Sequence, residues 1–119
     1  MNPDVAKLEA DLNTMISKGE ILAAFEKHYA DDIVMQENSE PPCTGKAANR
    51  VREQAFVDSV GQVHSIKLVH SAVNGDVAFS EWLLDLTFRG GQRAQLAQVS
   101  VRRWKQDRVV HERFYYNKG

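Results

Sequence analysis

Two strands and the tight turn between them are encoded in residues 103–116, which read RWKQDRVVHERFYY. Apolar and polar side chains alternate on both sides of Gln106-Asp107, a pattern typical of an antiparallel hairpin with a two-residue turn. Successive side chains of a strand point to opposite faces, so Glu112 is predicted to share a face with Phe114 and Tyr116. A carboxylate among aromatic rings is either an acid/base group or a structural charge with a partner.

The spacing of the apolar residues changes once along the chain, near Gly61. Upstream, three- and four-residue spacings predict helices at 4–17, 21–30 and 46–60, with a short strand at 33–35. Downstream, alternation predicts strands at about 63–73, 77–89, 93–105 and 108–116. Helices followed by an antiparallel meander are typical of the α+β class. With 119 residues, of which 43% are apolar, residues 1–119 are expected to form a single domain.

The third predicted helix carries an apolar stripe. Ala47, Val51 and Ala55 recur every four residues and are expected to face the core. Arg52 and Glu53 are expected to lie mostly on the opposite side of this helix. The segment before the helix, residues 38–45, contains two prolines and a glycine and is predicted to be a loop.

The turns of the meander allow the faces of the sheet to be predicted, because a two-residue turn fixes which residues pair. If Gly90-Gly91 is such a turn as well, one face holds Trp82, Leu84, Ala97, Val99, Val101, Val110, Glu112, Phe114 and Tyr116. This apolar face is expected to be concave and covered by the helices. The other face would hold Phe79, Glu81, Leu83, Asp85, Gln98, Ser100, Arg102, Trp104, His111, Arg113 and Tyr115. Such a mixture of aromatic and charged groups is typical of a subunit interface, although a β-bulge would reverse the assignment beyond it.

The composition argues against several classes of function. The sequence has no apolar run of about 18 residues and no signal peptide pattern, so we expect a cytoplasmic protein with no membrane partner. Cys43 is the only cysteine and the histidines show no metal-ligand spacing, so no internal disulfide and no metal site are expected. Residues 77–119 are basic, but their basic side chains alternate with apolar ones, so no nucleic-acid partner is expected.

The order of these elements resembles the NTF2-like superfamily, which includes the SnoaL-like polyketide cyclases and the ketosteroid isomerases. Residues 29–32, which read YADD, precede a proline-rich loop and Gly45-Lys46, as in the family's "YADD…G" passage. Residues 103–117 are similar to its closing hairpin. The resemblance implies a cystatin-like cone, in which three N-terminal helices pack on a curved antiparallel sheet around a pocket. It also implies a homodimer through the convex face of the sheet.

Two carboxylates are candidate catalytic groups. Proton abstraction beside a carbonyl needs a base with a pKa near neutrality, and burial among apolar groups raises the pKa of a carboxylate. Glu112 is the first candidate. Glu37 is the second, because the resemblance implies a base just after the short strand. The candidate ligand-binding walls are Trp82, Phe114, Tyr116 and Val99. Alternatively, Glu112 pairs with Arg103 or Arg50 and braces the sheet.

Three hypotheses follow for the function. The first is an isomerase, cyclase or dehydratase that acts on a small carbonyl compound without a cofactor. The second is a non-catalytic binding module for a small apolar or acidic ligand, and the third is a dimeric interaction scaffold. The two oxyanion donors of the ketosteroid isomerases correspond to about Leu12 and Ser100, so steroid isomerisation by the same constellation is not expected. An unpaired Glu112 beside an open cavity would favour the enzyme, whereas an arginine partner would favour the other two.

Overall fold

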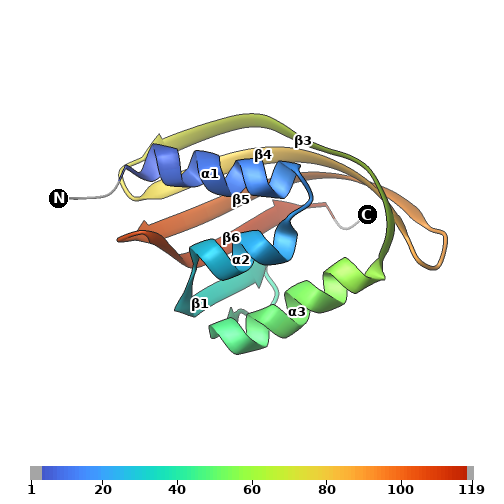
Figure 1. The fold of residues 1–119 in the computed structure, drawn as a ribbon, viewed down its shortest axis with the longest axis horizontal. Coiled ribbons are helices and arrows are strands. Elements are labelled where there is room, and N and C mark those ends of the chain that lie inside the picture. The colour runs from blue at the N-terminus through green and yellow to red at the C-terminus, as the bar shows by residue number, and fades with distance from the viewer. Residues whose placement is uncertain (1–3, 118–119) are drawn as a thin grey trace.

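The computed structural model describes residues 4–117. Its helices are α1 (Val5–Ser17), α2 (Ile21–His28) and α3 (Lys46–Ser59). Its strands are β1 (Tyr29–Glu37), β2 (Cys43–Thr44), β3 (Val60–Asn74), β4 (Val77–Phe88), β5 (Arg93–Lys105) and β6 (Arg108–Tyr116). The strands form one curved sheet in the order β2-β1-β6-β5-β4-β3, and the helices lie over one side of it (Figure 1). The predicted α+β class, with three helices packed on a curved sheet, is confirmed. All neighbouring strands are antiparallel except β1 and β6.

The YADD passage starts a strand, where the sequence predicted the end of a helix. α2 stops at His28, and Tyr29 is already extended. Tyr29 pairs with Val109 of β6, so strand pairing competes successfully with the helical pattern. Within the predicted loop, β2 is a short strand that pairs with β1.

Two register shifts change the predicted face of β5. Thr87 pairs with Arg93, whereas the predicted Gly90-Gly91 turn would have paired it with Ala94, so the predicted register of β5 is wrong by one residue. In the last hairpin, Lys105 pairs with Arg108 as predicted, but Val110 is an extra residue that forms a β-bulge. The shift at the bulge reverses the effect of the first shift, so Glu112, Phe114 and Tyr116 of β6 lie on the predicted face. Only β5 is inverted relative to the prediction, and in β6 Val109 is buried in place of Val110.

Helix α3 is turned the other way from the prediction. Its apolar stripe faces solvent, and Val51 is 69% exposed. Its inward face carries Asn49, which is buried, and Glu53, which is half-buried. The side-chain amide of Asn49 donates to the carbonyl oxygens of Cys43 (2.9 Å) and Gly45 (2.8 Å), and more weakly to that of Ile33 (3.4 Å). These bonds attach α3 to β1 and β2 by its polar side.

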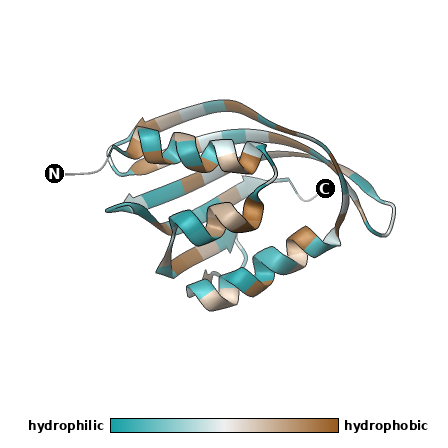
Figure 2. Ribbon diagram, viewed as in Figure 1, coloured by the Kyte–Doolittle hydropathy of each residue, from teal (hydrophilic) through white to brown (hydrophobic). Residues whose placement is uncertain are grey.

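The main core lies between α1, α2 and the inner side of the sheet. Its buried apolar members are Leu12, Ala24, Phe25, Tyr29, Ile33, Met35, Ala78, Trp104 and Val109. Hydrophobic and hydrophilic residues alternate along the long strands (Figure 2), as expected for a sheet with one covered face.

Candidate functional site

Glu112 is completely buried and has two partners. The bulge at Val110 places it opposite Arg102 of β5, whose Nε donates to Oε2 of Glu112 at 2.5 Å. The hydroxyl of Tyr29 donates to Oε1 at 2.6 Å. Of the two interpretations of Glu112, the paired structural charge fits this geometry, but the partner is Arg102. Neither Arg103 nor Arg50 takes this place, because Arg103 is exposed next to the bulge and Arg50 pairs with Glu26.

Arg102 bridges Glu112 to a second buried carboxylate on α1. Its Nη1 donates to Glu9 Oε2 at 2.7 Å and to Asn13 Oδ1 at 2.8 Å. Ser80 Oγ (2.6 Å) and Trp104 Nε1 (3.0 Å) also donate to Glu9. Burial alone would lower the pKa of Arg102, but the negative charges around it, that of Glu112 foremost, raise its pKa above its ordinary value. We call these residues the buried network: Glu9, Asn13, Tyr29, Ser80, Arg102, Trp104 and Glu112.

The buried network closes one half of the inner sheet face, and the other half is only partly covered. Beyond Trp82, which is 2% exposed, Leu86 is also buried, but five neighbouring inward-facing side chains are only half-buried. They are Leu84, Leu96, Gln98, Phe114 and Tyr116, and we call them the accessible half. Trp82, Phe114 and Tyr116 therefore share the inner face, as predicted. Val99 does not, because the register shift places it opposite Glu81 and Tyr115 on the outer face.

Glu37, the last residue of β1, reaches the accessible half. Its Oε1 accepts a hydrogen bond from the hydroxyl of Tyr116 at 3.2 Å, and its Oε2 lies 3.3 Å from Nη2 of Arg52. Burial and the adjacent charge of Glu37 raise the pKa of Tyr116 to about 12. Glu37 is thus anchored at the rim by one cation and one hydroxyl.

Glu53 is a site residue that the sequence pattern did not reveal. It lies one turn after Asn49 on the inward face of α3. Within residues 4–117 it makes no hydrogen bond or ion pair. Burial, together with the negative charges of Glu112 and Glu37, raises the pKa of Glu53 to about 7. The apolar stripe of α3 indicated the opposite orientation. In the sequence, only Asn49, which follows Ala47 and Ala48, indicated a polar contact on this side of the helix.

Ser100 also differs from its predicted position. It lies on the inner face of β5, between Ser80 and Phe114 on the neighbouring strands, and is 1% exposed. Its hydroxyl has no hydrogen-bond partner among the described residues. Buried hydroxyl groups nearly always have a partner, so this hydroxyl is an unused hydrogen-bond donor beside Phe114.

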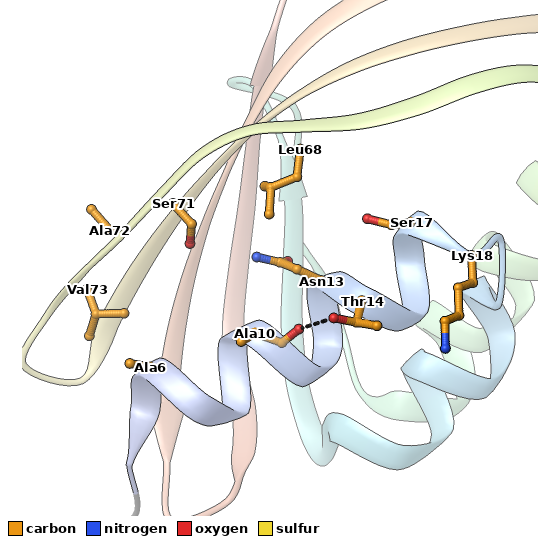
Figure 3. A pocket seen from close by; sticks show the side chains of 10 residues that line it. All are labelled: Ala6, Ala10, Asn13, Thr14, Ser17, Lys18, Leu68, Ser71, Ala72 and Val73. Carbon is orange, nitrogen blue, oxygen red and sulfur yellow. Dashed lines mark hydrogen bonds between the residues drawn. The ribbon is translucent and has the colours of Figure 1, made fainter.

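A separate groove of about 620 Å³ runs between α1 and β3. It is lined by Ala6, Ala10, Asn13, Thr14, Ser17, Lys18, Leu68, Ser71, Ala72 and Val73. Figure 3 shows Asn13 and Leu68 pointing into it from opposite sides. Most of the lining is exposed, and Asn13 and Ser71 already hydrogen-bond to Ser80. We therefore place the candidate site at the accessible half, where half-buried apolar groups meet titratable ones.

Within residues 4–117, no three side chains of the metal-binding types gather at one place. None of the helices in this range is long and apolar enough to cross a bilayer.

Comparison with solved structures shows the same architecture. A Mesorhizobium loti protein, provisionally assigned as a SnoaL-like polyketide cyclase, shares 29% identity with a TM-score of 0.86, covering 96% of this chain and 100% of its own. A provisionally assigned SnoaL-like polyketide cyclase from Jannaschia superposes with a TM-score of 0.80 at 10% identity. The superposition covers 93% of this chain and 86% of the Jannaschia chain. A provisionally assigned isomerase from Bacillus subtilis superposes with a TM-score of 0.75 at 13% identity. The superposition covers 97% of this chain and 90% of the Bacillus chain. No curated protein matches.

The family assignment comes from the sequence itself. The model of the SnoaL-like domain matches residues 9–116. This range extends from Glu9 of the buried network to Tyr116 of the accessible half. The chain belongs to the SnoaL-like domain family.

Proposed function

We propose that residues 1–119 act as one domain that binds a small carbonyl compound on the accessible half and isomerises, cyclises or dehydrates it by carboxylate acid/base chemistry, without a cofactor. The observation that carries the proposal is the uneven cover of the inner face. Leu84, Leu96 and Phe114 keep part of their apolar surface exposed beside titratable groups, and a ligand that covers them gains about 25 cal/mol per Å² of apolar surface removed from water.

The polar groups around this surface suit an uncharged carbonyl compound. The Ser100 hydroxyl is free to donate to a carbonyl oxygen. Glu37 supplies a carboxylate at the rim, and Glu53 supplies a second one from the inward face of α3. An acidic ligand, which the sequence left open, is disfavoured because these carboxylates would repel it.

We predict that a panel of small uncharged ketones raises the melting temperature of the protein and perturbs amide resonances of the accessible half in NMR titrations. Leu84→Arg should weaken this binding at least about tenfold, since it replaces apolar contact surface by a charge. Val51→Arg is the matched control, because it adds the same charge at an apolar side chain that faces solvent on α3, outside the accessible half. Equal affinity of the two variants would contradict the proposed location. Ketone binding without turnover would favour the non-catalytic binding module, which the sealed position of Glu112 also supports.

We further propose that the partner of the outer sheet face is a second copy of this chain. Phe79, Leu83 and Tyr115 on this face are each at least 40% exposed. Large aromatic and aliphatic groups of this kind are enriched at the centre of protein interfaces.

Light scattering is expected to report a dimer for the wild type at micromolar concentration and a monomer for Leu83→Arg. Val51→Arg is the control, because Val51 is 69% exposed on α3, away from the outer face. A monomeric wild type would refute the dimer, and a monomeric Val51→Arg variant would move the interface to α3.

A further inference from the structure

Four carboxylates and two guanidinium groups gather around the inner face. Arg102 is already bound to Glu9 and Glu112. Arg52 is bound to Glu37. Glu53 is the carboxylate that no arginine of this group neutralises, although both arginines act on it from a distance.

The position of Glu53 is fixed by the fold. The amide bonds of Asn49 hold α3 with its polar side inward, and Glu53 follows four residues later on that side. Partial burial weakens the hydration of its charged form, and the negative charges of Glu112 and Glu37 oppose ionisation further. Near neutral pH, protonation therefore neutralises the charge of Glu53 in part of the molecules.

We propose that Glu53 is the group that exchanges a proton with the ligand, in place of Glu112, which the buried network seals, and of Glu37, which Arg52 neutralises. The inference rests on the proposed function, because it assumes a carbonyl ligand on the accessible half. A general base works best when it is partly ionised at the working pH, and the pKa of about 7 meets this condition.

Glu53 and the ligand are the only two reactants in this proton transfer. The ionised carboxylate of Glu53 takes a proton from the carbon next to the ligand carbonyl. The C–H bond breaks, an O–H bond forms on Glu53, and the electron pair moves to the carbonyl oxygen as an enolate. Return of the same proton to a different carbon of a conjugated enolate completes an isomerisation and restores the carboxylate.

The test uses 3-cyclohexen-1-one as a probe, with its conversion to 2-cyclohexen-1-one followed by absorbance and its deuterium uptake in D₂O followed by NMR. Glu53→Gln should lower the rate by about 10²–10⁴-fold. It should also abolish an ionisation near pH 7 in the pH–rate profile. Asp58→Asn is the matched control, since it removes a carboxylate from the exposed side of the same helix and should leave the rate unchanged.

Stability measurements show whether a loss of activity reflects unfolding. The folded pKa of Glu53 lies above the ordinary value of 4.5, so the native state binds more protons between pH 4.5 and about 7. Its contribution to stability is complete below this interval and is lost as the pH rises through it. Glu53→Gln lacks this loss and should be more stable than the wild type at pH 8.

A ligand-free readout is the titration of the Glu53 side-chain carboxyl by ¹³C NMR, with an expected midpoint near pH 7. A midpoint at its ordinary value would overturn the inference whatever the probe does. Full activity of Glu53→Gln would overturn it while leaving the enzymatic proposal standing. If the probe binds but takes up no deuterium, proton transfer is wrong and ligand binding stands. If the probe does not bind, the proposed function loses its support and the titration alone decides the state of Glu53.

Discussion

Arg102→Met is expected to lower the free energy of unfolding by about 3–5 kcal/mol, the usual cost of removing one partner from a buried ion pair. The Arg102 side chain is 2% exposed and makes three hydrogen bonds within the buried network, to Glu112, Glu9 and Asn13. Its loss would leave two buried carboxylates without a cation. Methionine is unbranched and adaptable and replaces the aliphatic stem of arginine, so the change removes chiefly the charged head group and its hydrogen bonds. Urea denaturation of both proteins measures the difference.

The neighbouring arginine provides the control for this prediction. Arg103 lies on the outer face of the same strand and is exposed, so Arg103→Met should change the free energy of unfolding by no more than about 0.5 kcal/mol. Adding Glu9→Gln and Glu112→Gln to Arg102→Met should recover part of the loss, because the uncompensated charges are then gone. Equal stability of the two single variants would show that the buried network does not brace the sheet.

The same arginine shows where sequence reasoning reached its limit. The closing hairpin, its turn and the inward position of Glu112 followed from alternation alone. The partner of Glu112 did not, because Val110 forms a bulge and moves Arg102 opposite Glu112. A bulge of one residue leaves the apolar pattern nearly unchanged but exchanges the two faces of the strand beyond it. Val99 was assigned to the wrong face by the other register shift, because the turn around Gly90-Gly91 pairs it with Glu81 and not with Trp82.

The orientation of α3 shows a different limit. The stripe of Ala47, Val51 and Ala55 is a genuine apolar pattern, but small side chains gain little from burial, about 25 cal/mol per Å². The buried amide of Asn49 donates to the backbone carbonyl oxygens of Cys43 and Gly45, and a buried amide without such partners costs about 1–3 kcal/mol. The tertiary hydrogen bonds of Asn49 therefore outweigh the burial of the apolar stripe. The spacing of apolar residues in the sequence does not reveal such bonds. Glu53 was missed for this reason.

Asn49→Asp should consequently be among the most damaging conservative changes in this protein. The shape of the side chain is kept, but a carboxylate has no hydrogen to donate and would face the carbonyl oxygens of Cys43 and Gly45. We expect a loss of about 3 kcal/mol or more at pH 8, since an unsatisfied buried charge costs more than an unsatisfied neutral group. Asn49→Ala removes the donors without adding charge and should cost about 1–3 kcal/mol.

Gln54→Glu is the control for the amide-to-acid change on α3, because within residues 4–117 the Gln54 side chain bonds only to two side chains of its own helix, those of Arg50 and Asp58. It should alter stability by no more than about 0.5 kcal/mol. If Asn49 holds α3 in place, Asn49→Ala should also shift the ¹³C titration midpoint of Glu53 down towards its ordinary value, because a loosened helix lets that carboxylate reach water. An unchanged midpoint in a destabilised Asn49→Ala variant would mean that other contacts orient the helix, and that the protonation of Glu53 does not depend on this amide.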